Sequence, residues 1–557
     1  MKRLFLLLTC AMAVLCVSAQ DKEIAISKAD ASSAQGGEEA PNAIDGNYGT
    51  LWHSPHSGTT FPIDFTITLD EPTHVDYVRY VPRQGNSNGN WNEVEIFYCP
   101  TTTGEDFIFV KSYDLKGSSA PSNLFLGAKG VECGQIKITI KSGANGFAAA
   151  AELEVYAIDY SKEEMYAQYF EDDLFSQLKP SVTSSEGIED ATLKALVDNL
   201  LNNAEGYKKF RVGEYEPYLT TSTLQRILQV KSQYNNYENP TGIYLKGGES
   251  CWVAVSGIDY NYPVGLTIKN WVQNENSSSY SLHNGLNYIT APRFTEGNVF
   301  VHYYTDDFEK APNVKVHFIN ASVQGYWDQA TMTNEDWQEM LKGRSSDDNT
   351  ILITRSEHAQ LAFPVSAWLT HCPTNIDSTM TLYQQVQWAE RDILGLEKYG
   401  RQVKNRQLYY ATTYGFMAAG GEGAYCNVNS LGGIMKPDAK SFDFWGVGHE
   451  WGHNNQVSPG FHWSGCGETT NNIYASWAQI HAQIDFGVDS YKLRLEDEVT
   501  GVNDYSGMRG GRMQTYFEEG LRKGIAWQLW DGPDYHGITP NSVTVTGRDA
   551  EGNDIVM

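Results

Sequence analysis

The spacing of apolar residues changes part-way along this chain of 557 residues, and this change constrains the fold more than any other feature. Between about residues 22 and 157, apolar and polar residues alternate in short stretches that Gly, Asn and Pro separate. A period of two predicts strands with one buried face, and many short strands at this spacing are typical of a β-sandwich. We therefore expect a β-sandwich over residues 20–159.

The rest of the chain mixes helical and strand patterns. Residues 160–238 carry apolar residues at every third or fourth position, which predicts a helical connector. Strand patterns then return, and longer helical patterns follow them. Because one hydrophobic core rarely organises a chain of this length, we expect several domains. The last is an α/β unit over residues 239–557, with a β-rich part at about 239–320 and a catalytic part at about 321–557.

The first 19 residues have the features of an export signal. Lys2 and Arg3 form a basic start, residues 4–17 are apolar, and small residues precede the expected cleavage after Ala19. No other stretch approaches the roughly 18 apolar residues that a membrane-spanning helix needs. We therefore expect an exported protein without a transmembrane segment, either secreted, periplasmic or at the cell surface.

The charge of the chain excludes one class of partner. The formal net charge is −27, and removal of Lys2 and Arg3 with the signal makes it −29. Such an acidic protein is repelled by polyanions, so we expect no nucleic acid partner. The six cysteines that follow the signal are scattered singly without a CxxC spacing, which argues against a zinc knuckle and against a dense disulfide framework.

Residues 449–453, His-Glu-Trp-Gly-His, carry the chemistry. Positions four apart on a helix lie on one face, so His449 and His453 can present two imidazoles to one metal while Glu450 projects beside them. This is the arrangement of two zinc ligands and a general base in a metallopeptidase. The alternative is a pair of surface histidines with no ligand.

A catalytic zinc needs a third protein ligand and keeps its fourth position for water or substrate. His462 and Glu468 both follow at a suitable distance. Glu468 comes after a Gly-rich turn and begins a predicted helix, whereas His462 lies in an irregular loop, so the ligand set favours Glu468. Gln456 and Pro459 stand where a metzincin has glycine and histidine, which excludes that pattern.

Two asparagines follow the predicted third ligand. Asn472 lies one turn after Glu468, where its side chain could hold a histidine ligand in the right tautomer. The alternative is that Asn471 and Asn472 only cap or solvate the start of the helix. The sequence leaves both interpretations open.

Residues 242–249, 449–456 and 467–473 resemble the zinc metallopeptidases of family sixty, which include viral enhancins and bacterial mucin-degrading O-glycopeptidases. The resemblance spans about residues 239–482. It implies a gluzincin-type fold, a Zn²⁺ cofactor, and cleavage of glycoprotein backbones next to O-linked sugars. Members generally continue beyond the zinc helices, so a chain that ends at Met557 is either a short member or incomplete.

The same resemblance implies a mechanism in which Glu450 is the general base and a zinc-bound water is the nucleophile. It also implies that Asn471 and Trp463 touch the substrate, although loop packing is the alternative for Trp463. The donor to the developing oxyanion stays open among four residues. These are Tyr505, Tyr516, His481 and His536.

In the N-terminal part, residues 43–52 and 151–156 resemble a discoidin-like module, that is, a coagulation factor type C or family thirty-two carbohydrate-binding module. The resemblance implies glycan binding and a structural Ca²⁺, a cation that prefers oxygen ligands. Asp45, Thr50 and Glu152 match that calcium pattern. An Asp-Gly turn without metal is the alternative.

Three further residues of this module are candidates for sugar binding. His53, Arg83 and Trp91 lie in or beside predicted loops, where a galactose-type sugar could stack and form hydrogen bonds. Trp52, by contrast, is predicted to lie in the core.

Together these features predict a zinc-dependent endopeptidase that acts on O-glycosylated, mucin-type glycoproteins. One alternative is a glycan-binding adhesin with an inactive peptidase unit, but such a protein has no chemical need for Glu450 between the histidines. The other is a general metalloprotease that is indifferent to glycans. The predicted glycan-binding module argues against it only by association.

Overall fold

The computed structural model describes residues 21–272, 277–458, 460 and 467–487, together with the backbone of three short strands nearer the C-terminus. These strands are β27 (Ala526–Gln528), β28 (Thr546–Arg548) and β29 (Asp554–Val556). The described chain forms two compact units. The first contains the described residues up to 217 together with 239–270 and 277–323, and the second contains 218–238, 271–272 and those from 324 onward.

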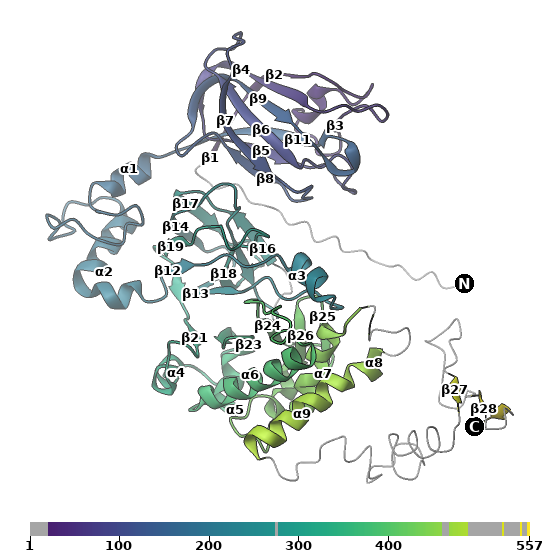
Figure 1. Cartoon of the computed structure of the whole chain (residues 1–557). Coiled ribbons are helices and arrows are strands. Elements are labelled where there is room, and N and C mark those ends of the chain that lie inside the picture. Colours follow the sequence, from purple (N-terminus) through teal and green to yellow (C-terminus); the bar gives the residue numbers. More distant parts are fainter. Residues whose placement is uncertain are drawn as a thin grey trace, which may run out of the picture. The chain divides into compact units, whose positions relative to one another are not determined.

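The first unit begins with a sandwich of two antiparallel sheets, which confirms the predicted β-sandwich (Figure 1). One sheet has the order β2 (Ile26–Ala31), β4 (Ile63–Val75), β9 (Val131–Ile140), β6 (Glu93–Cys99) and β7 (Ile108–Asp114). The other has the order β1 (Asp21–Ile24), β11 (Glu152–Ile158), β5 (Tyr77–Val81) and β8 (Ser122–Phe125). Every second residue from Ile63 to Leu69 is buried, as the alternating pattern requires.

Short elements close one end of the sandwich. Strand β3 (Trp52–His53) pairs with β10 (Ala149–Ala150), and two 3-10 helices, η1 (Ala40–Ala43) and η2 (Ala144–Gly146), lie in the connecting segments. Trp52 packs edge-on against Phe65 inside the core, as the sequence predicts.

The predicted connector is divided between the two units. It contains α1 (Ser161–Ala167) and α2 (Ala191–Lys208), and the side chain of Asp190 caps α2 by accepting from the backbone N–H of Leu193. It also contains β12 (Val212–Tyr215), which pairs with β19 (Val314–Phe318). The segment therefore contributes a strand to a sheet, while α3 (Thr221–Leu228) belongs to the second unit.

The rest of the first unit is all β. One sheet has the order β12, β19, β14 (Ser250–Ser256) and β17 (Gly285–Thr290). The other has the order β16 (Ser277–Ser281), β15 (Gly265–Lys269), β18 (Gly297–His302), β13 (Asn239–Leu245) and β20 (Ser322–Val323). Their inner faces share one apolar core, so this part is β-rich, as predicted.

The second unit is α/β, as predicted. Its six-stranded mixed sheet has the order β21 (Tyr326–Asp328), β22 (Ile351–Arg355), β23 (Ala359–Pro364), β24 (Gln407–Thr412), β26 (Gly423–Asn427) and β25 (Met417–Gly420). Besides α3, its described helices are α4 (Asn334–Leu341), α5 (Val365–His371), α6 (Ile376–Ile393), η3 (Val428–Gly433), α7 (Phe444–Asn455), α8 (Gly467–Thr470) and α9 (Asn472–Phe486). Helix α7 packs against α6, α9, β25 and β26 (Figure 1).

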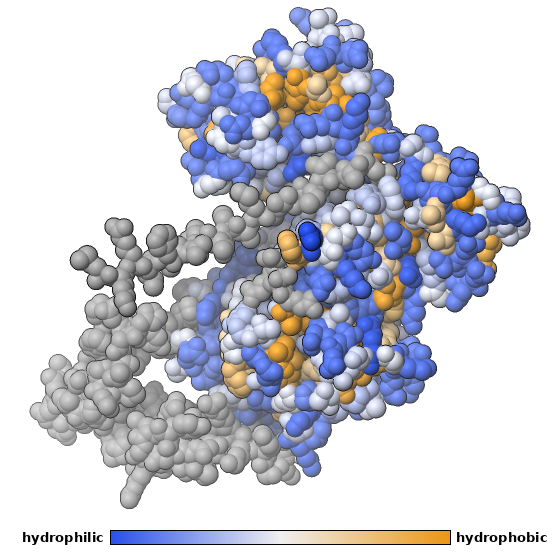
Figure 2. Space-filling model, turned by 180° about the vertical axis from the view of Figure 1, so that it is seen from behind, coloured by the Kyte–Doolittle hydropathy of each residue, from blue (hydrophilic) through white to orange (hydrophobic). Residues whose placement is uncertain are grey.

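The face shown in Figure 2 is largely hydrophilic, with apolar residues in a few separate areas. Among the described residues, no helix is long and apolar enough to span a membrane. Cys99, Cys133, Cys251, Cys372 and Cys426 are all buried and form no disulfide, while Cys466 lies outside the described residues.

Candidate metal centre

Glycines in α7 bring a second helix against the motif. Asp443 begins α7 by accepting a hydrogen bond of 2.8 Å from the N–H of Gly446. A Cβ atom on Gly448 would lie 3.2 Å from Cα of Ala475, and one on Gly452 would lie 2.9 Å from the carbonyl oxygen of Asn471. Larger residues at these positions would force α9 away, so the glycines that precede each histidine allow the close approach of the two helices.

The approach of α8 and α9 places Glu468 opposite the two histidines. Its Oε2 atom lies 3.3 Å from Nε2 of His449 and 3.2 Å from Nε2 of His453. The two imidazole rings are 4.8 Å apart and nearly perpendicular, at 87°. Bonds of about 2.0–2.2 Å in a tetrahedral zinc site separate the ligand atoms by about 3.3 Å. These three residues could therefore hold a metal ion.

Asn472 fixes the orientation of one imidazole. The distance from Nδ1 of His449 to Oδ1 of Asn472 is 2.7 Å, and the Asn472 amide donates to the carbonyl oxygen of Glu468 at 2.9 Å. Because the amide oxygen can only accept, Nδ1 of His449 carries the proton and Nε2 presents its lone pair. This contact is the one expected if Asn472 supports a ligand.

Asn471 lies in a different place from the one that the sequence predicts. Its side chain is fully buried, and its amide nitrogen lies 3.1 Å from Nε2 of His449 and 2.9 Å from Nε2 of His453. Since it faces the two imidazoles from inside the protein, the predicted contact of Asn471 with substrate is corrected to a contact with the histidines. Trp463 lies outside the described residues.

Glu450 is buried beside the cluster, at 7% exposure. Burial, and then the charges of Glu468 and Asp443, raise the pKa of Glu450 to about 8. Burial also lowers the pKa of His453, which favours the neutral imidazole that binds metals. A carboxyl group whose pKa lies near neutrality is suited to accept a proton and to return it.

Of the four candidates for the oxyanion donor, only His481 lies among the described residues. It is nine positions after Asn472 on α9, which corresponds to about 13 Å along the helix. Its ring nitrogens face Asp392 and Asp485, at 3.7 and 3.6 Å. His481 therefore lies away from the cluster, and Tyr505, Tyr516 and His536 stay predictions.

A segment that sequence analysis missed holds the C-terminal end of α7. The backbone N–H of Lys231 donates to the carbonyl oxygen of Gln456 at 2.8 Å, and that of Ser458 donates to the carbonyl oxygen of Gln229 at 2.7 Å. The hydroxyl of Tyr234 donates to Asn455 at 3.1 Å. The first of these bonds uses a carbonyl that the helix end leaves unpaired, and together they hold residues 229–234 against the end of the helix that carries both histidines.

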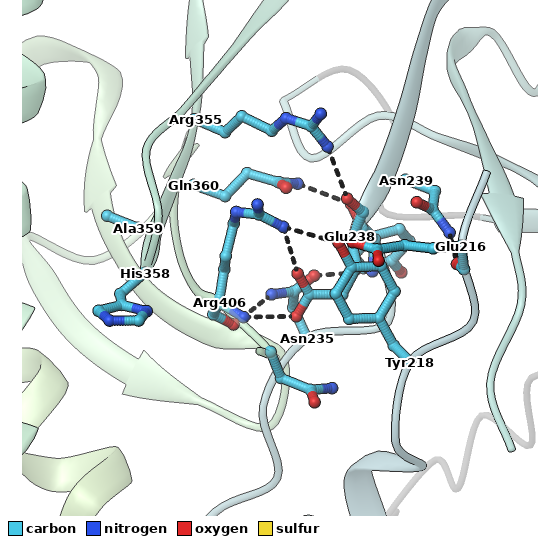
Figure 3. A network of polar contacts seen from close by, with 12 residues as sticks. Glu216, Tyr218, Asn235, Glu238, Asn239, Arg355, His358, Ala359, Gln360 and Arg406 are labelled. Carbon is cyan, nitrogen blue, oxygen red and sulfur yellow. Dashed lines mark hydrogen bonds and ion pairs between the residues drawn. The ribbon is translucent and has the colours of Figure 1, made fainter. Parts of the chain in front are cut away.

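A buried ion pair anchors that segment to the sheet (Figure 3). Glu238 is fully buried, and its carboxylate lies 3.3 Å from the guanidinium of Arg406 and accepts from the Arg406 backbone N–H at 2.6 Å. Arg406 also donates to the hydroxyl of Tyr218 at 3.0 Å, and Asn235 donates to the Arg406 carbonyl at 2.8 Å. Burial raises the pKa of Glu238 to about 7, although the charge of Arg406 opposes that shift.

The predicted calcium ligands approach one another in the sandwich. The hydroxyl of Thr50 donates to the carboxylate of Asp45 at 2.8 Å, and the N–H of Gly46 donates to Glu152 at 3.2 Å. Burial raises the pKa of Glu152 to about 7, which favours its neutral form. The hydrogen bonds fit an Asp-Gly turn, and calcium at this place stays a prediction.

Among the predicted sugar-binding residues, Trp91 is contradicted by the structure. It is fully buried and stacks on Tyr80, with ring centroids 3.9 Å apart, so it belongs to the core. His53 is largely buried, with its ring 5.5 Å from that of Phe147, and Arg83 is half-buried. The charge of Arg83 contributes to a lowered pKa of His53, whose main cause is burial, so these two residues lie near each other.

Comparison with known proteins identifies both parts. Residues 323–533 match the model of peptidase M60, enhancin and enhancin-like proteins, and residues 28–153 match that of the F5/8 type C domain. The chain contains an enhancin-like peptidase domain. The three residues of the cluster lie inside this enhancin-like domain, and the sandwich is the F5/8 type C domain.

Individual relatives cover only part of the chain. An alignment 139 positions long, which covers 23% of this chain and 17% of the relative, gives 32% identity to the A type blood N-acetyl-alpha-D-galactosamine deacetylase of Flavonifractor plautii. A metallopeptidase from Bacteroides thetaiotaomicron shares the fold, with 23% identity, a TM-score of 0.51, and coverage of 60% of this chain and 57% of that one. A metallopeptidase in complex with Tn antigen is 24% identical, with a TM-score of 0.44 and coverage of 51% and 53%.

Proposed function

We propose that this protein is an exported zinc-dependent endopeptidase that cleaves O-glycosylated, mucin-type glycoproteins. The observation that carries the proposal is the position of one carboxylate oxygen of Glu468, 3.3 and 3.2 Å from the Nε2 atoms of His449 and His453. Two neutral imidazoles and a carboxylate are a donor set of catalytic zinc sites. The match of this region to the enhancin-like family supports the same conclusion.

Zinc, when bound, supplies a Lewis acid that polarises the peptide carbonyl and makes water a nucleophile near neutral pH. Glu450 takes the proton from the attacking water and gives it to the leaving amine. Asn472 keeps His449 in the tautomer that presents Nε2. The burial of Glu450 keeps bulk water from its carboxylate, so the proton stays between this side chain and the substrate.

The edge of the sheet offers a place for the peptide backbone. Strand β25 pairs only with β26 among the described residues, its four residues are half-buried, and it packs against α7. The amide of Asn454 donates to the Gly420 carbonyl at 3.0 Å, which ties this strand to the helix. An extended peptide can add to such an edge through main-chain hydrogen bonds, which positions its carbonyl beside the cluster.

Support for a glycosylated substrate comes from the F5/8 type C domain and from the curated relative, whose name states an action on a galactosamine of a blood-group glycan. In the sandwich, His53 lies beside the ring of Phe147 and near Arg83, a combination that suits a sugar with one apolar face. We infer that this domain holds the enzyme on its glycosylated substrate.

The test is cleavage of an O-glycosylated mucin and of its enzymatically deglycosylated form, with the product termini identified by mass spectrometry. We expect cleavage of the glycosylated form only. Glu450→Gln should abolish it while zinc remains bound. Glu357→Gln, at a glutamate that is 77% exposed in the same unit, serves as the matched control and should retain cleavage.

Equal cleavage of the two forms would identify a general metalloprotease instead. Binding to mucin without cleavage, in protein that contains one zinc at the enhancin-like site, would identify an adhesin with an inactive peptidase unit. Cleavage that survives Glu450→Gln would remove this residue as the base.

A further inference from the structure

A network of buried polar side chains surrounds the C-terminal end of α7. Asn455, the last residue of this helix, is buried, and its side-chain oxygen accepts from Gln407 at 2.8 Å and from the hydroxyl of Tyr234 at 3.1 Å. Its backbone carbonyl oxygen accepts from the hydroxyl of Tyr474 on α9 at 2.9 Å. Asn455 therefore joins the end of α7 to several other elements, at a position only two residues after His453.

A carboxyl group is a further partner of Asn455. Glu390, in the last turn of α6, is fully buried, and its Oε2 atom accepts a hydrogen bond from the amide of Asn455. The same amide donates to Oε1 of Gln407 at 3.1 Å. Gln387, which lies three positions before Glu390 on α6, also donates to that oxygen of Gln407. These four buried side chains thus form one continuous network.

A negative charge on Glu390 would have no cation to balance it among the described residues. The ionisable side chains that face it from other elements are the phenols of Tyr234 and Tyr474. The guanidinium of the neighbouring Arg391 donates instead to two backbone carbonyl groups of the loop before β24. The last turn of a helix also disfavours negative charge. Burial accordingly raises the pKa of Glu390 well above its usual value.

Two oxygens of the network lack a hydrogen-bond donor among the described residues. They are Oε1 of Glu390 and Oε1 of Gln387. Residues three positions apart lie on one face of a helix, and the other polar atoms of these two side chains already bind neighbouring groups of the network. Because a buried oxygen without a donor is costly, one proton on Glu390 would satisfy both atoms, with Oε1 of Glu390 as donor and Oε1 of Gln387 as acceptor.

We propose that Glu390 is a positioning residue of the enhancin-like centre, a neutral carboxyl group that donates to Gln387, accepts from Asn455 and so holds the turn that carries His453. The inference rests on the proposed function, in which His453 is a zinc ligand. Glu390 acts through Asn455 and takes no part in proton transfer. The two buried glutamates of the unit then have opposite tasks, since Glu450 must gain and lose a proton whereas Glu390 must keep one.

The first test compares Glu390→Gln with Glu390→Leu in the full chain. Glutamine keeps a neutral donor and an acceptor at this place, so Glu390→Gln should retain both the zinc affinity, measured by competition with a chelator, and kcat on a glycosylated mucin. Glu390→Leu removes both groups and should lower zinc affinity by about tenfold, the lower end of the loss for an outer-shell partner. A tenfold loss in Glu390→Gln would show that the group acts as an anion and would overturn the proposal.

Met380→Ala is the control that separates positioning from stability. Met380 is fully buried on the same helix, and its sulfur accepts from the hydroxyl of Thr354, outside the network. The cavity left by this substitution should lower the melting temperature at least as much as Glu390→Leu does, while zinc affinity stays unchanged. If Met380→Ala weakens zinc binding as much as Glu390→Leu, the effect is one of general stability and the proposal fails.

Two further measurements are independent of cleavage. In a double-mutant cycle with Asn455→Ala, Glu390→Leu should cause no additional loss of zinc affinity, because its effect passes through Asn455, and additive losses would contradict this path. The infrared difference spectrum between the wild type and Glu390→Gln at pH 7 should contain the C=O band of a protonated carboxyl group, and carboxylate bands would overturn the proposal. If both results are as expected but no mucin is cleaved, the proposed function fails and the role of Glu390 stands.

Discussion

Two groups of two histidines and one glutamate lie on different scaffolds in the described part of the chain: His449, His453 and Glu468 on α7 and α8, and Glu38, His53 and His56 in the sandwich. On α7, the rings of His449 and His453 are 4.8 Å apart at 87°, and in the sandwich those of His53 and His56 are 4.9 Å apart at 81°. The first pair lies four residues apart on one helix. The second lies three residues apart where a strand ends and a loop begins. Similar geometry is thus reached once through helical periodicity and once through loop contacts.

The supports of the two clusters differ in the same way. The ring of His449 is oriented by the side chain of Asn472, whereas that of His53 is oriented by the backbone of Ser54. A side-chain support can be removed by one substitution, but a backbone carbonyl cannot. We infer that the helical cluster depends on side chains beyond its histidines and glutamate, while the loop cluster is oriented chiefly by the backbone.

The largest effect should follow from removal of a helical ligand. His453→Ala leaves two ligands, so zinc affinity at the enhancin-like site should fall by more than the roughly 10–100-fold that an outer-shell partner costs. Cleavage should become undetectable. Metal analysis and cleavage of a glycosylated mucin measure the two effects, and unchanged zinc binding would show that His453 is not a ligand.

The helical cluster is the one that sequence analysis found. Spacing alone brought together His449, His453 and Glu450, because positions four apart on a helix must share a face. Glu468 and Asn472 required one more step, a returning helix, which Gly448 and Gly452 make possible through close packing. The alternation of strands and the change to helical periodicity likewise predicted the sandwich and the α/β unit.

What the sequence did not show depends on contacts between distant segments. Glu38 approaches His53 and His56 although it is 15 residues from His53, and the only regular elements between them are the short 3-10 helix η1 and the first residue of β3. Glu238 and Arg406 are further apart still, and no periodicity connects them. Trp91 is predicted to lie in or beside a loop where a sugar could stack, and the stacking on Tyr80 that buries it cannot be derived from local pattern.

Glu238→Ala tests whether the stability of the second unit depends on contacts between residues that are distant in sequence. Removing one partner of a buried ion pair leaves the charge of Arg406 without compensation, so the second unit should lose about 3–5 kcal/mol of unfolding free energy. Urea denaturation of the full chain measures this loss. Glu339→Ala, in an ion pair whose two side chains are each 72% exposed, should change stability by less than about 1 kcal/mol. Similar losses for both would refute a special role of the buried anchor.

His317 is a structural histidine and contrasts with the predicted zinc ligands. Nδ1 of His317 donates to the Leu174 carbonyl at 2.7 Å, and its Nε2 lies 2.9 Å from the Tyr207 hydroxyl, which itself donates to the Ile319 carbonyl, so both nitrogens have partners inside the first unit. Burial lowers the pKa of His317 to about 4. Between these pH values His317 binds a proton in the unfolded chain but not in the folded chain. The free energy of unfolding should therefore fall as pH drops from about 6.5 to about 4, by about 3 kcal/mol in total.

Denaturation at pH 7 and pH 5 measures this effect. About 2 kcal/mol of the contribution should already be lost at pH 5, and His317→Gln should remove that part of the pH dependence. His302→Gln, at an exposed histidine of the same unit, should leave the pH dependence unchanged. A pH dependence that persists in His317→Gln would mean that His317 titrates normally in the folded protein.

The smallest effect is expected from Asn472, the side chain that orients the ring of His449. Asn472→Ala removes the acceptor of the His449 Nδ1 proton, so zinc affinity should fall by about 10–100-fold, or about 1.4–2.7 kcal/mol. Asn472→Asp keeps an acceptor oxygen and should restore most of the affinity, whereas Ser476→Ala on the same helix should have no effect. Competition with a zinc chelator measures all three. If Asn472→Ala lowers the melting temperature but leaves zinc affinity unchanged, the residue only stabilises the helix start, and the helical cluster is as independent of its neighbours as the loop cluster.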